Sequence, residues 1–513
     1  MKKGLTLLIA VFTCLSLVGC DKKEKKDTNE TGGKTTVINK VDYNDYKISS
    51  NSVGDFDLFF LKNDSKNDAI KQNKIYSPLS IKFALEMLLE GANGETKTQI
   101  SNIIGTYNTR KYDNNANMSF ANALFIRDSY KNSVNNSYSE LLKSKYNAEV
   151  IYDSFDNPDK INKWIGDKTF ELIKDSIDNV SDDNFILVNA LAIDMKWVNK
   201  IQPTTMDDEW AVDYYNNHIL FYEEVNTYEN SVNIDEPVEI GAVVNKYDIV
   251  KVLGKDKIKE TVRSEYQKWL ADPTSESCLG SMSEEPDVDT YINNTITEKY
   301  YNEMNEVYGE RSSSTDFEFY NDENVKVFAK DLKEYNGTTL QYVAIMPKTK
   351  DIDNYIEEVK AKDINTLISK LKTIDEYEAK EGVITHITGF LPVFNFDYEL
   401  DLVDELQVLG VTDVFDLEKA DLSNMVTDKQ YIGNATHKAT IEFTNEGITA
   451  AATSTMGGSG SGDCGFEYYF EPPIEKINLT FDKPFIFLIR DKYTGEVWFV
   501  GANYTSLAKK TEY

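Results

Sequence analysis

Few residues of this 513-residue chain could do chemistry. It has three histidines, His218, His386 and His437, and no two of them stand one helical turn apart, as metal-binding pairs do. The glycine-rich stretch Met456–Gly465 is not followed by the lysine and helix that a phosphate-binding loop needs. No nucleophile elbow and no cysteine–histidine pattern is present. We therefore expect no catalytic activity, no metal and no cofactor.

A different kind of reactivity is suggested by residues 447–462, which carry no charge and no proline. As a strand, this stretch would place Ile448, Ala450, Ala452, Ser454 and Met456 on one face and Thr449, Ala451, Thr453 and Thr455 on the other. Small side chains can slide past neighbouring strands, and Gly447 supplies a flexible hinge. The absence of proline leaves the backbone N–H groups able to pair. The pattern predicts a segment that can enter an existing sheet, and the alternative is an exposed linker.

Composition indicates a globular protein, since 41% of the residues are hydrophobic and 12% are aromatic. The formal net charge is −31. A charge of that sign argues against binding to nucleic acid or to anionic lipid through charge, because phosphates must be met by clustered lysine and arginine.

The first twenty residues combine a basic start with an apolar run too short to span a bilayer comfortably. They end in Leu17-Val18-Gly19-Cys20, which resembles a bacterial lipoprotein signal. That resemblance implies removal of the residues before Cys20 and acylation of its thiol, on the extracellular face of the bacterial cell membrane. An ordinary secretory signal is the alternative. Residues 21–51 have the composition of a solvated tether.

Local sequence patterns predict the helices and strands that must position residues 447–462. Residues 53–65 have a short apolar helical face, and Ile75 and Tyr76 are typical of a strand before a helix that begins at Pro78 and stops at Gly91. Strand, helix and strand are expected in "ANALFIRD", "INKWIGDKTFELIKD" and "FILVNALAIDMKW", the last one buried on both faces.

These strings, in order, resemble the serpin family over about 350 residues. The matching strings include "SPLSIKFALEMLLEGANGETKTQI", "ANALF", "INKW", "LVNALAIDMKW", "LPVFNF", "LQVLGVTDVFD", "ADLS", "THKATIEFTNEGITAAA" and "DKPFIFLIRDKYTGEVWFVG". The resemblance implies an α+β fold with helices around a large central mixed sheet and two smaller sheets. It places the family's domain in residues 52–200 and 316–508, with an exposed reactive-centre loop at 447–480.

The resemblance also implies a function, the suicide inhibition of serine or cysteine endopeptidases. In the family a protease cleaves the loop, and the loop then inserts into the central sheet and distorts the acyl-enzyme. The hinge would be Gly447, Ile448, Thr449, Ala450, Ala451, Ala452 and Thr453. Thr449 departs from the family's usual acidic residue, and Phe170-Glu171 departs from its usual Asn-Gly. A non-inhibitory surface lipoprotein that acts as a binding or adhesion module is the alternative.

The family's count from the hinge glycine places the scissile bond between Ser461 and Gly462, which suits elastase-like or subtilisin-like enzymes. Phe466, Tyr468 and Tyr469 are alternatives, because the loop is longer than in compact family members. The family's polar cluster under the central sheet is matched by Ser77, Ser80, Asn189 and His437. The family's position at the point where the loop enters the sheet is matched by Trp197.

An insertion at residues 201–315 is implied, since the family uses fewer residues there. Stretches such as "KDKIKETVRSEYQKWLAD" have helical spacing, so we expect a helical subdomain. A disulfide between Cys278 and Cys464 and two free thiols both remain open. The expected partners are a target protease and the membrane through Cys20. No heparin-type site is expected, and we expect a monomer.

Overall fold

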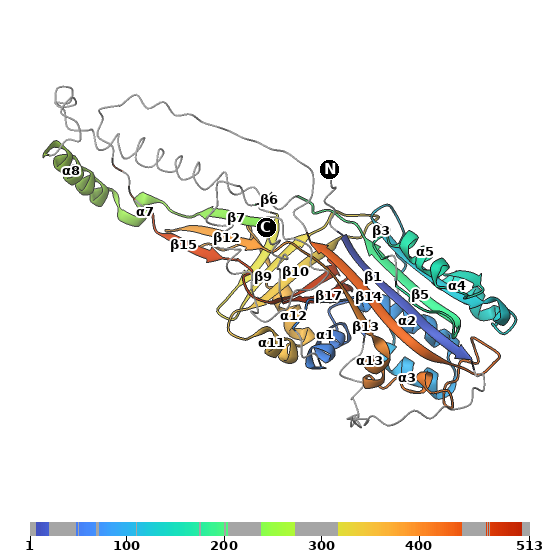
Figure 1. Cartoon of the computed structure of the whole chain (residues 1–513). Coiled ribbons are helices and arrows are strands. Elements are labelled where there is room, and N and C mark those ends of the chain that lie inside the picture. The colour runs from blue at the N-terminus through green and yellow to red at the C-terminus, as the bar shows by residue number, and fades with distance from the viewer. Residues whose placement is uncertain are drawn as a thin grey trace, which may run out of the picture.

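The computed structural model describes the chain at residues 7–19, 48–49, 51–67, 71–108, 110–173, 176–199, 202–203, 238–271, 316–443, 468, 470 and 472–504. Three sheets and the helices around them make up this part of the molecule (Figure 1). The arrangement is the α+β fold expected from the sequence.

The first sheet has six strands in the order β13-β14-β1-β5-β3-β4. Its strands are β1 (Leu7–Gly19), β3 (Met118–Arg127), β4 (Glu149–Asp153), β5 (Asp183–Ile193), β13 (Phe394–Asp401) and β14 (Gln430–Phe443). All neighbours are antiparallel except β3 and β4, so the sheet is mixed. Every residue of β5 is buried, as the continuous apolar run predicted, because helices cover both faces of the sheet.

Strand β1 is formed by residues that the sequence indicates as a leader. The sequence did not predict this strand, because the same apolar run is typical of a secretion signal. Removal of the leader is a question of processing and stays a prediction. Figure 1 shows β1 lying between β5 and β14 along nearly their whole length.

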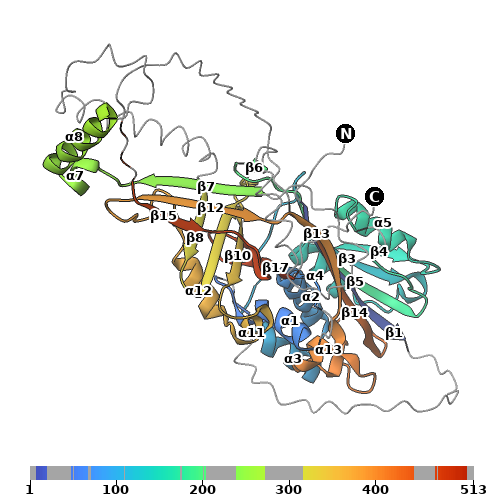
Figure 2. The same ribbon diagram turned by 60° about the vertical axis from the view of Figure 1, so that its left-hand side comes forward.

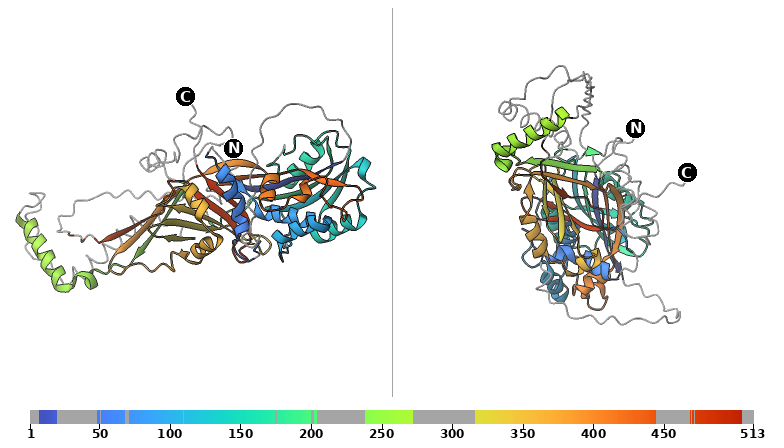
Figure 3. Two further views of the ribbon diagram at one scale, coloured as in Figure 1. Left: turned by 90° about the horizontal axis from the view of Figure 1, so that it is seen from below. Right: turned by 90° about the vertical axis from the view of Figure 1, so that its left-hand side faces the viewer.

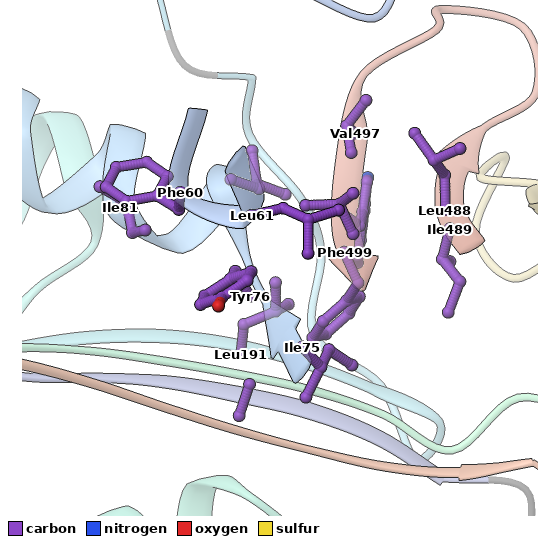
Figure 4. Close-up of a cluster of buried hydrophobic side chains, with 14 of the residues drawn as sticks. Phe60, Leu61, Ile75, Tyr76, Ile81, Leu191, Leu488, Ile489, Val497 and Phe499 are labelled. Atoms are coloured by element: carbon purple, nitrogen blue, oxygen red, sulfur yellow. The ribbon is translucent and has the colours of Figure 1, made fainter. Parts of the chain in front are cut away.

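The second sheet is antiparallel and has seven shorter strands in the order β11-β8-β9-β10-β16-β17-β2. They are β2 (Lys74–Tyr76), β8 (Phe317–Asn321), β9 (Val325–Asp331), β10 (Leu340–Pro347), β11 (Lys372–Thr373), β16 (Phe485–Asp491) and β17 (Val497–Asn503). Figure 4 shows its apolar side chains from β16 and β17 facing those of β2 and of the helix before it. The core is therefore continuous between the two sheets.

The third sheet has the order β15-β12-β7-β6, with β6 (Gln202–Pro203), β7 (Val238–Asn245), β12 (Ile384–Leu391) and β15 (Ile474–Asn478). It extends to one end of the elongated molecule, where helices α7 (Ile249–Leu253) and α8 (Lys255–Ala271) follow β7 (Figures 2 and 3). The expected helix is present as α8, but β7 adds a strand to a segment for which only helices were expected. Whether 201–315 is one subdomain stays a prediction.

The remaining helices surround the first two sheets. They are α1 (Asp55–Asn67), α2 (Pro78–Gly91), α3 (Gly94–Ile104), α4 (Asn136–Tyr146), α5 (Asp159–Lys168), α11 (Ile352–Glu358), α12 (Ala361–Ser369) and α13 (Leu402–Val408), with short 3-10 turns η1 (Asp128–Tyr130) and η5 (Asp413–Phe415). Helix α2 begins at Pro78 as predicted, with Ser77 as its N-cap. Helix α5 is shorter than predicted.

The early end of α5 has a local cause. Phe170 and Glu171 both have positive φ angles, 53° and 64°, so the helix cannot continue through them. The backbone N–H of Glu171 instead donates to the carbonyl of Gly166 over 2.8 Å and closes the last turn. These are the two residues that stand where the resembled family has Asn-Gly, the pair that adopts such angles most easily.

A buried charge cluster joins three elements under the sheets. Lys82 of α2 contacts Asp57 of α1 and Glu496, which precedes β17, at 2.8 Å each, and all three side chains are fully buried. Burial raises the pKa of both carboxyl groups, and the two carboxylates raise the pKa of Lys82 despite its burial. The cluster fixes α2 against α1 and β17.

Candidate functional site

The middle of the first sheet holds a position for one additional strand. Among the described strand pairs, β5 and β14 do not pair with each other, and β1 pairs with both. The β1–β14 register runs from Leu7 opposite Glu442 to Gly19 opposite Gln430. We call the space between β5 and β14 the slot. It accepts a strand of 13 residues that runs antiparallel to both of its neighbours.

A hydrogen-bonded chain of buried side chains runs beneath the sheet on the β5 side of the slot. The Ser80 hydroxyl donates to the side-chain oxygen of Asn189 on β5, and the Asn189 amide donates to Asn122 of β3 over 2.8 Å. Asn122 in turn donates to the carbonyl of Tyr146 over 2.9 Å. The chain continues across β5 into β3, so the strand that bounds the slot is held to its outer neighbour by side chains as well as by backbone pairing.

His437 holds the other side of the slot. Its Nε2 accepts a hydrogen bond from the backbone N–H of Ser77 over 2.9 Å, and the Ser77 hydroxyl donates to the carbonyl of Trp498 over 2.7 Å. Burial lowers the pKa of His437 to about 3, so the imidazole is neutral at neutral pH and Nε2 is free of a proton. Ser77, Ser80, Asn189 and His437 therefore lie together, as a group shared by α2, β5 and β14.

Phe12 of β1 marks where this group meets the slot. In the backbone register it stands opposite His437 on one side and Asn189 on the other. Any strand that fills the slot must pass between these two residues. The polar group therefore lies beneath the part of the sheet where Phe12 stands between these two residues.

Trp197 lies at the end of the slot where β14 stops. It is buried, and its ring contacts those of Tyr342 and Phe443 with centroids 6.0 and 5.4 Å apart. Phe443 is the last residue of β14, so the chain that leaves toward residue 447 starts from this aromatic cluster. The cluster fixes the end of β14, four positions before Gly447.

The same end carries two carboxyl groups that the sequence did not single out. Asp194 directly follows β5, and Glu442 is the penultimate residue of β14. Burial raises the pKa of each, and the Asp194 carboxylate raises the pKa of Glu442 further. At this end of the slot, ionising a carboxyl group is therefore energetically unfavourable.

The far end of the predicted loop is anchored on the helices that follow β7. Phe470 is buried in a cluster with Tyr247, Ile249, Ile258, Val262, Tyr266 and Ile384, and Tyr468 packs against the same cluster. The rings of Tyr468 and Phe470 meet edge to face with centroids 5.0 Å apart. The chain then continues into β15, which pairs in parallel with β12.

Several predicted site residues lie outside the described part of the chain. These are the hinge residues Gly447 to Thr453, the bond Ser461–Gly462, the alternatives Phe466 and Tyr469, and the cysteines Cys20, Cys278 and Cys464.

Sequence reasoning missed Asn122 and the continuation of the network to Tyr146. A signal was present, because Asn122 is a polar residue inside the wholly apolar context of "FANALF", and a buried amide needs partners. Within the described ranges, no group of three or more His, Cys, Asp or Glu could hold a metal ion. Of the helices seen in those ranges, none is both apolar enough and long enough to cross a bilayer.

The comparisons with known proteins agree with this geometry. The family model described as "Serpin (serine protease inhibitor)" matches residues 51–218 and 311–505. Neuroserpin of Mus musculus is 23% identical over 454 residues, which cover 84% of this chain and 85% of that protein. A serpin-like protein of Methanosarcina acetivorans is 24% identical over 522 residues, which cover 97% of this chain and 95% of that protein.

Solved structures show the same architecture. Uncleaved ovalbumin superposes with a TM-score of 0.53 at 16% identity, covering 88% of this chain and 99% of that one. The thermophilic serpin tengpin in its native state gives a TM-score of 0.52 at 18% identity, covering 94% and 96%. At these identities the likeness concerns the fold alone.

Proposed function

This chain belongs to the serpin family, and from that premise we propose that it traps serine or cysteine endopeptidases through cleavage and insertion of residues 447–461. The protease nucleophile would attack the carbonyl carbon of Ser461 and form an acyl bond to it. The amine of Gly462 would leave with a proton, which frees the new end of the loop. Insertion before water can hydrolyse the acyl bond would hold the enzyme in a distorted covalent complex.

The observation that carries this proposal is the slot. The sheet admits a complete strand between β5 and β14, and that strand runs antiparallel to β14. A chain that turns back after Phe443 would run in this same direction. Residues 447–459 number 13, the length of β1, so an inserted strand that starts at Gly447 ends two residues before Ser461.

The distal anchor favours Ser461–Gly462 over one aromatic alternative, Tyr468. Tyr468 packs against a buried cluster, and a protease needs its substrate residue extended in its own cleft. Residues 461 and 462 precede that anchor by several positions and carry only small side chains. We therefore propose enzymes with a shallow primary pocket, of the elastase or subtilisin type.

The cellular setting is also part of the proposal. Acylation of Cys20 would anchor the mature chain at the outer face of the bacterial cell membrane, and residues 21–51 would hold the inhibitor away from the lipid. A Cys278–Cys464 disulfide would tie the distal part of the loop to the segment after α8. We propose that the protein acts as a monomer, without nucleic acid and without a heparin-type site.

A test uses residues 21–513 incubated separately with pancreatic elastase, subtilisin, chymotrypsin and papain. Inhibition predicts a covalent complex that survives a denaturing gel, together with a released peptide that starts at Gly462. The Ala450→Arg variant places a charge in the inserting strand, so we expect cleavage at the same bond without a complex. Cleavage of the unaltered chain with neither a complex nor a gain in heat resistance would favour the alternative, a surface-binding module that keeps the fold without inhibition.

A further inference from the structure

Asp194 and Glu442 lie on the two sides of the slot at the same level. Glu442 of β14 stands opposite Leu7 of the strand that fills the slot. Ile193 of β5 stands opposite Leu8. One further step of this antiparallel register brings Asp194 beside Leu7. Residues that stand directly opposite each other in a sheet point to the same face, so the two carboxyl groups, which we call the carboxyl pair, flank one strand on one face.

The two groups of the carboxyl pair act on each other electrostatically. Burial raises the pKa of Glu442, and the Asp194 carboxylate raises it further. Burial also raises the pKa of Asp194, against the opposing effect of Lys196. One oxygen of Asp194, Oδ1, is buried and accepts no hydrogen bond within the described residues. The negative charge of the pair is therefore only partly compensated by the protein around it.

The backbone on the outer side of each group keeps the carboxyl pair in place. The N–H of Asp194 donates to the carbonyl of Asn117 over 2.7 Å, and the Asn117 side-chain amide donates to the carbonyl of Asp194 over 2.7 Å. Glu442 is held by the pairing of β14 with β13, where it stands opposite Asn395. A strand that enters the slot therefore meets two carboxyl groups that cannot move apart without loss of these bonds.

The surrounding charges leave this end of the slot negative. Asp397 and Glu399 of β13 lie beside β14 on the same face, and Glu399 contacts Lys438 at 3.8 Å. Lys196 follows β5, and residues 333 and 334, whose backbone contacts Lys196, carry one charge of each sign. Together with the carboxyl pair, these residues make five carboxylates and three cations, a balance of −2.

A loop that enters the slot from the end of β14 meets the carboxyl pair first. In the proposed insertion Gly447 takes the position of Leu7, so it stands between the two carboxyl groups without a side chain. Thr449 is then the first side chain on the same face, diagonal to both groups at about 7–8 Å, which a long side chain can reach. An acidic residue at 449 would add a third negative charge. The resembled family usually has an acidic residue there, and this chain has threonine.

We propose that the carboxyl pair selects the strand that enters the slot, because it excludes acidic side chains from the first positions and accepts neutral or basic ones. The inference rests on the proposed inhibitory function and names the residues that determine which loop sequence can insert. Asp194 and Glu442 impose the rule, and Thr449 is the residue on which they act. The strand that lies between them in this structure, Leu7–Gly19, carries no charged residue, which agrees with the rule.

The test compares two opposite charges at one position. Thr449→Glu and Thr449→Lys are made in residues 21–513, and again together with Asp194→Asn and Glu442→Gln, which remove the charges of the pair and keep the side-chain shapes. Each protein is mixed with subtilisin at pH 8, where a raised pKa still leaves both carboxyl groups ionised. The quantity measured is the number of inhibitor molecules consumed for each protease molecule trapped.

We expect Thr449→Glu to consume about threefold to tenfold more inhibitor per trapped protease than Thr449→Lys, because insertion brings the glutamate beside two like charges. The difference should fall below about twofold in the amide background and in about 0.5 M salt. Glu442→Gln alone should remove about half of it. Equal consumption by the two variants, or a difference that persists without the charges of the pair, would overturn the inference.

Thr453 provides the matched control. In the same register it takes the position of Thr13, opposite Thr436, on the same face and about 20 Å along the strand from Glu442. Lys438 is the nearer charged residue on β14. Thr453→Glu should therefore consume no more inhibitor than Thr453→Lys. An equal penalty for glutamate at both positions would indicate a general intolerance of acidic residues and would contradict a role for the carboxyl pair.

Failure of the unaltered chain to form a covalent complex with subtilisin would refute the proposed function instead. The inference would then be tested by heat resistance, because insertion of a cleaved loop raises the thermal midpoint. The gain after cleavage should be smaller for Thr449→Glu than for Thr449→Lys. The absence of any gain in every variant would overturn both proposals.

Discussion

The backbone N–H of Ser77 donates a hydrogen bond to Nε2 of His437 over 2.9 Å, although 360 residues separate them in the chain. The contact joins the N-cap of α2 to the middle of β14. The helix beneath the sheet and one wall of the slot are therefore joined by a hydrogen bond that requires a neutral imidazole.

This bond predicts a specific pH dependence of stability. The folded-state pKa of His437, about 3, lies below the ordinary value of 6.5, so between these pH values the unfolded chain binds a proton that the folded chain does not. The contribution of His437 to the unfolding free energy is complete above pH 6.5. It decreases toward pH 3 by about 1.4 kcal/mol per pH unit.

The variant His437→Gln keeps an acceptor but cannot titrate in this range. We expect its unfolding free energy to fall less steeply with acidification than that of the unaltered chain, measured by urea denaturation from pH 7 to pH 4. Parallel curves for the two proteins would show that His437 gains its proton equally in both states.

Replacement of Lys82 should be among the most damaging single changes. Lys82→Met leaves the carboxylates of Asp57 and Glu496 buried without their cation, so we expect a loss of about 3–5 kcal/mol of unfolding free energy. Adding Asp57→Asn and Glu496→Gln removes the stranded charges and should restore part of the loss. If the triple variant unfolds at no higher urea concentration than the single variant, the loss of stability comes from lost packing rather than from the buried charges.

The turn after α5 predicts a stabilising substitution. Glu171 has a φ of 64°, which glycine adopts without strain, so Glu171→Gly should raise the unfolding free energy by about 1 kcal/mol. Glu171→Ala is the matched control, because it removes the same carboxylate and keeps the Cβ atom. A thermal midpoint raised equally by both variants would assign the gain to the lost charge.

Features that depend on residues close together in the chain could be predicted from the sequence, whereas contacts between distant residues could not. Helix α2 and strand β5 were predictable because an N-cap with proline and an unbroken apolar run are local features. The partners of Lys82 were not, since Glu496 lies 414 residues away and no pattern links them.

Strand β1 shows a different limit, because one apolar segment satisfies two physical roles. A run of 13 residues with few polar groups suits both a secretion signal and a strand in the middle of a sheet. The packing of α8 was also beyond sequence reasoning. Helical spacing indicated α8, but only the fold brings its inner face onto Phe470.

Filling of the slot by β1 predicts that the whole chain and its processed form differ in reactivity. With Leu7–Gly19 in place, residues 447–459 have no position to enter, so residues 1–513 should be cleaved by subtilisin without trapping it and without gaining heat resistance. Residues 21–513 should do both. Val11→Pro in the whole chain removes one N–H from β1 and should shift its behaviour toward that of the shorter chain. Equal gains in thermal midpoint after cleavage of residues 1–513 and 21–513 would contradict this.

The direction of β1 has a consequence for a protease attached to the inserted loop. An inserted strand of 13 residues extends about 40 Å along β14, and it runs away from the end of the molecule that holds α8 (Figure 1). An enzyme attached to Ser461 would be carried over about the same distance, and any contact that it had made with the third sheet would have to break during that passage.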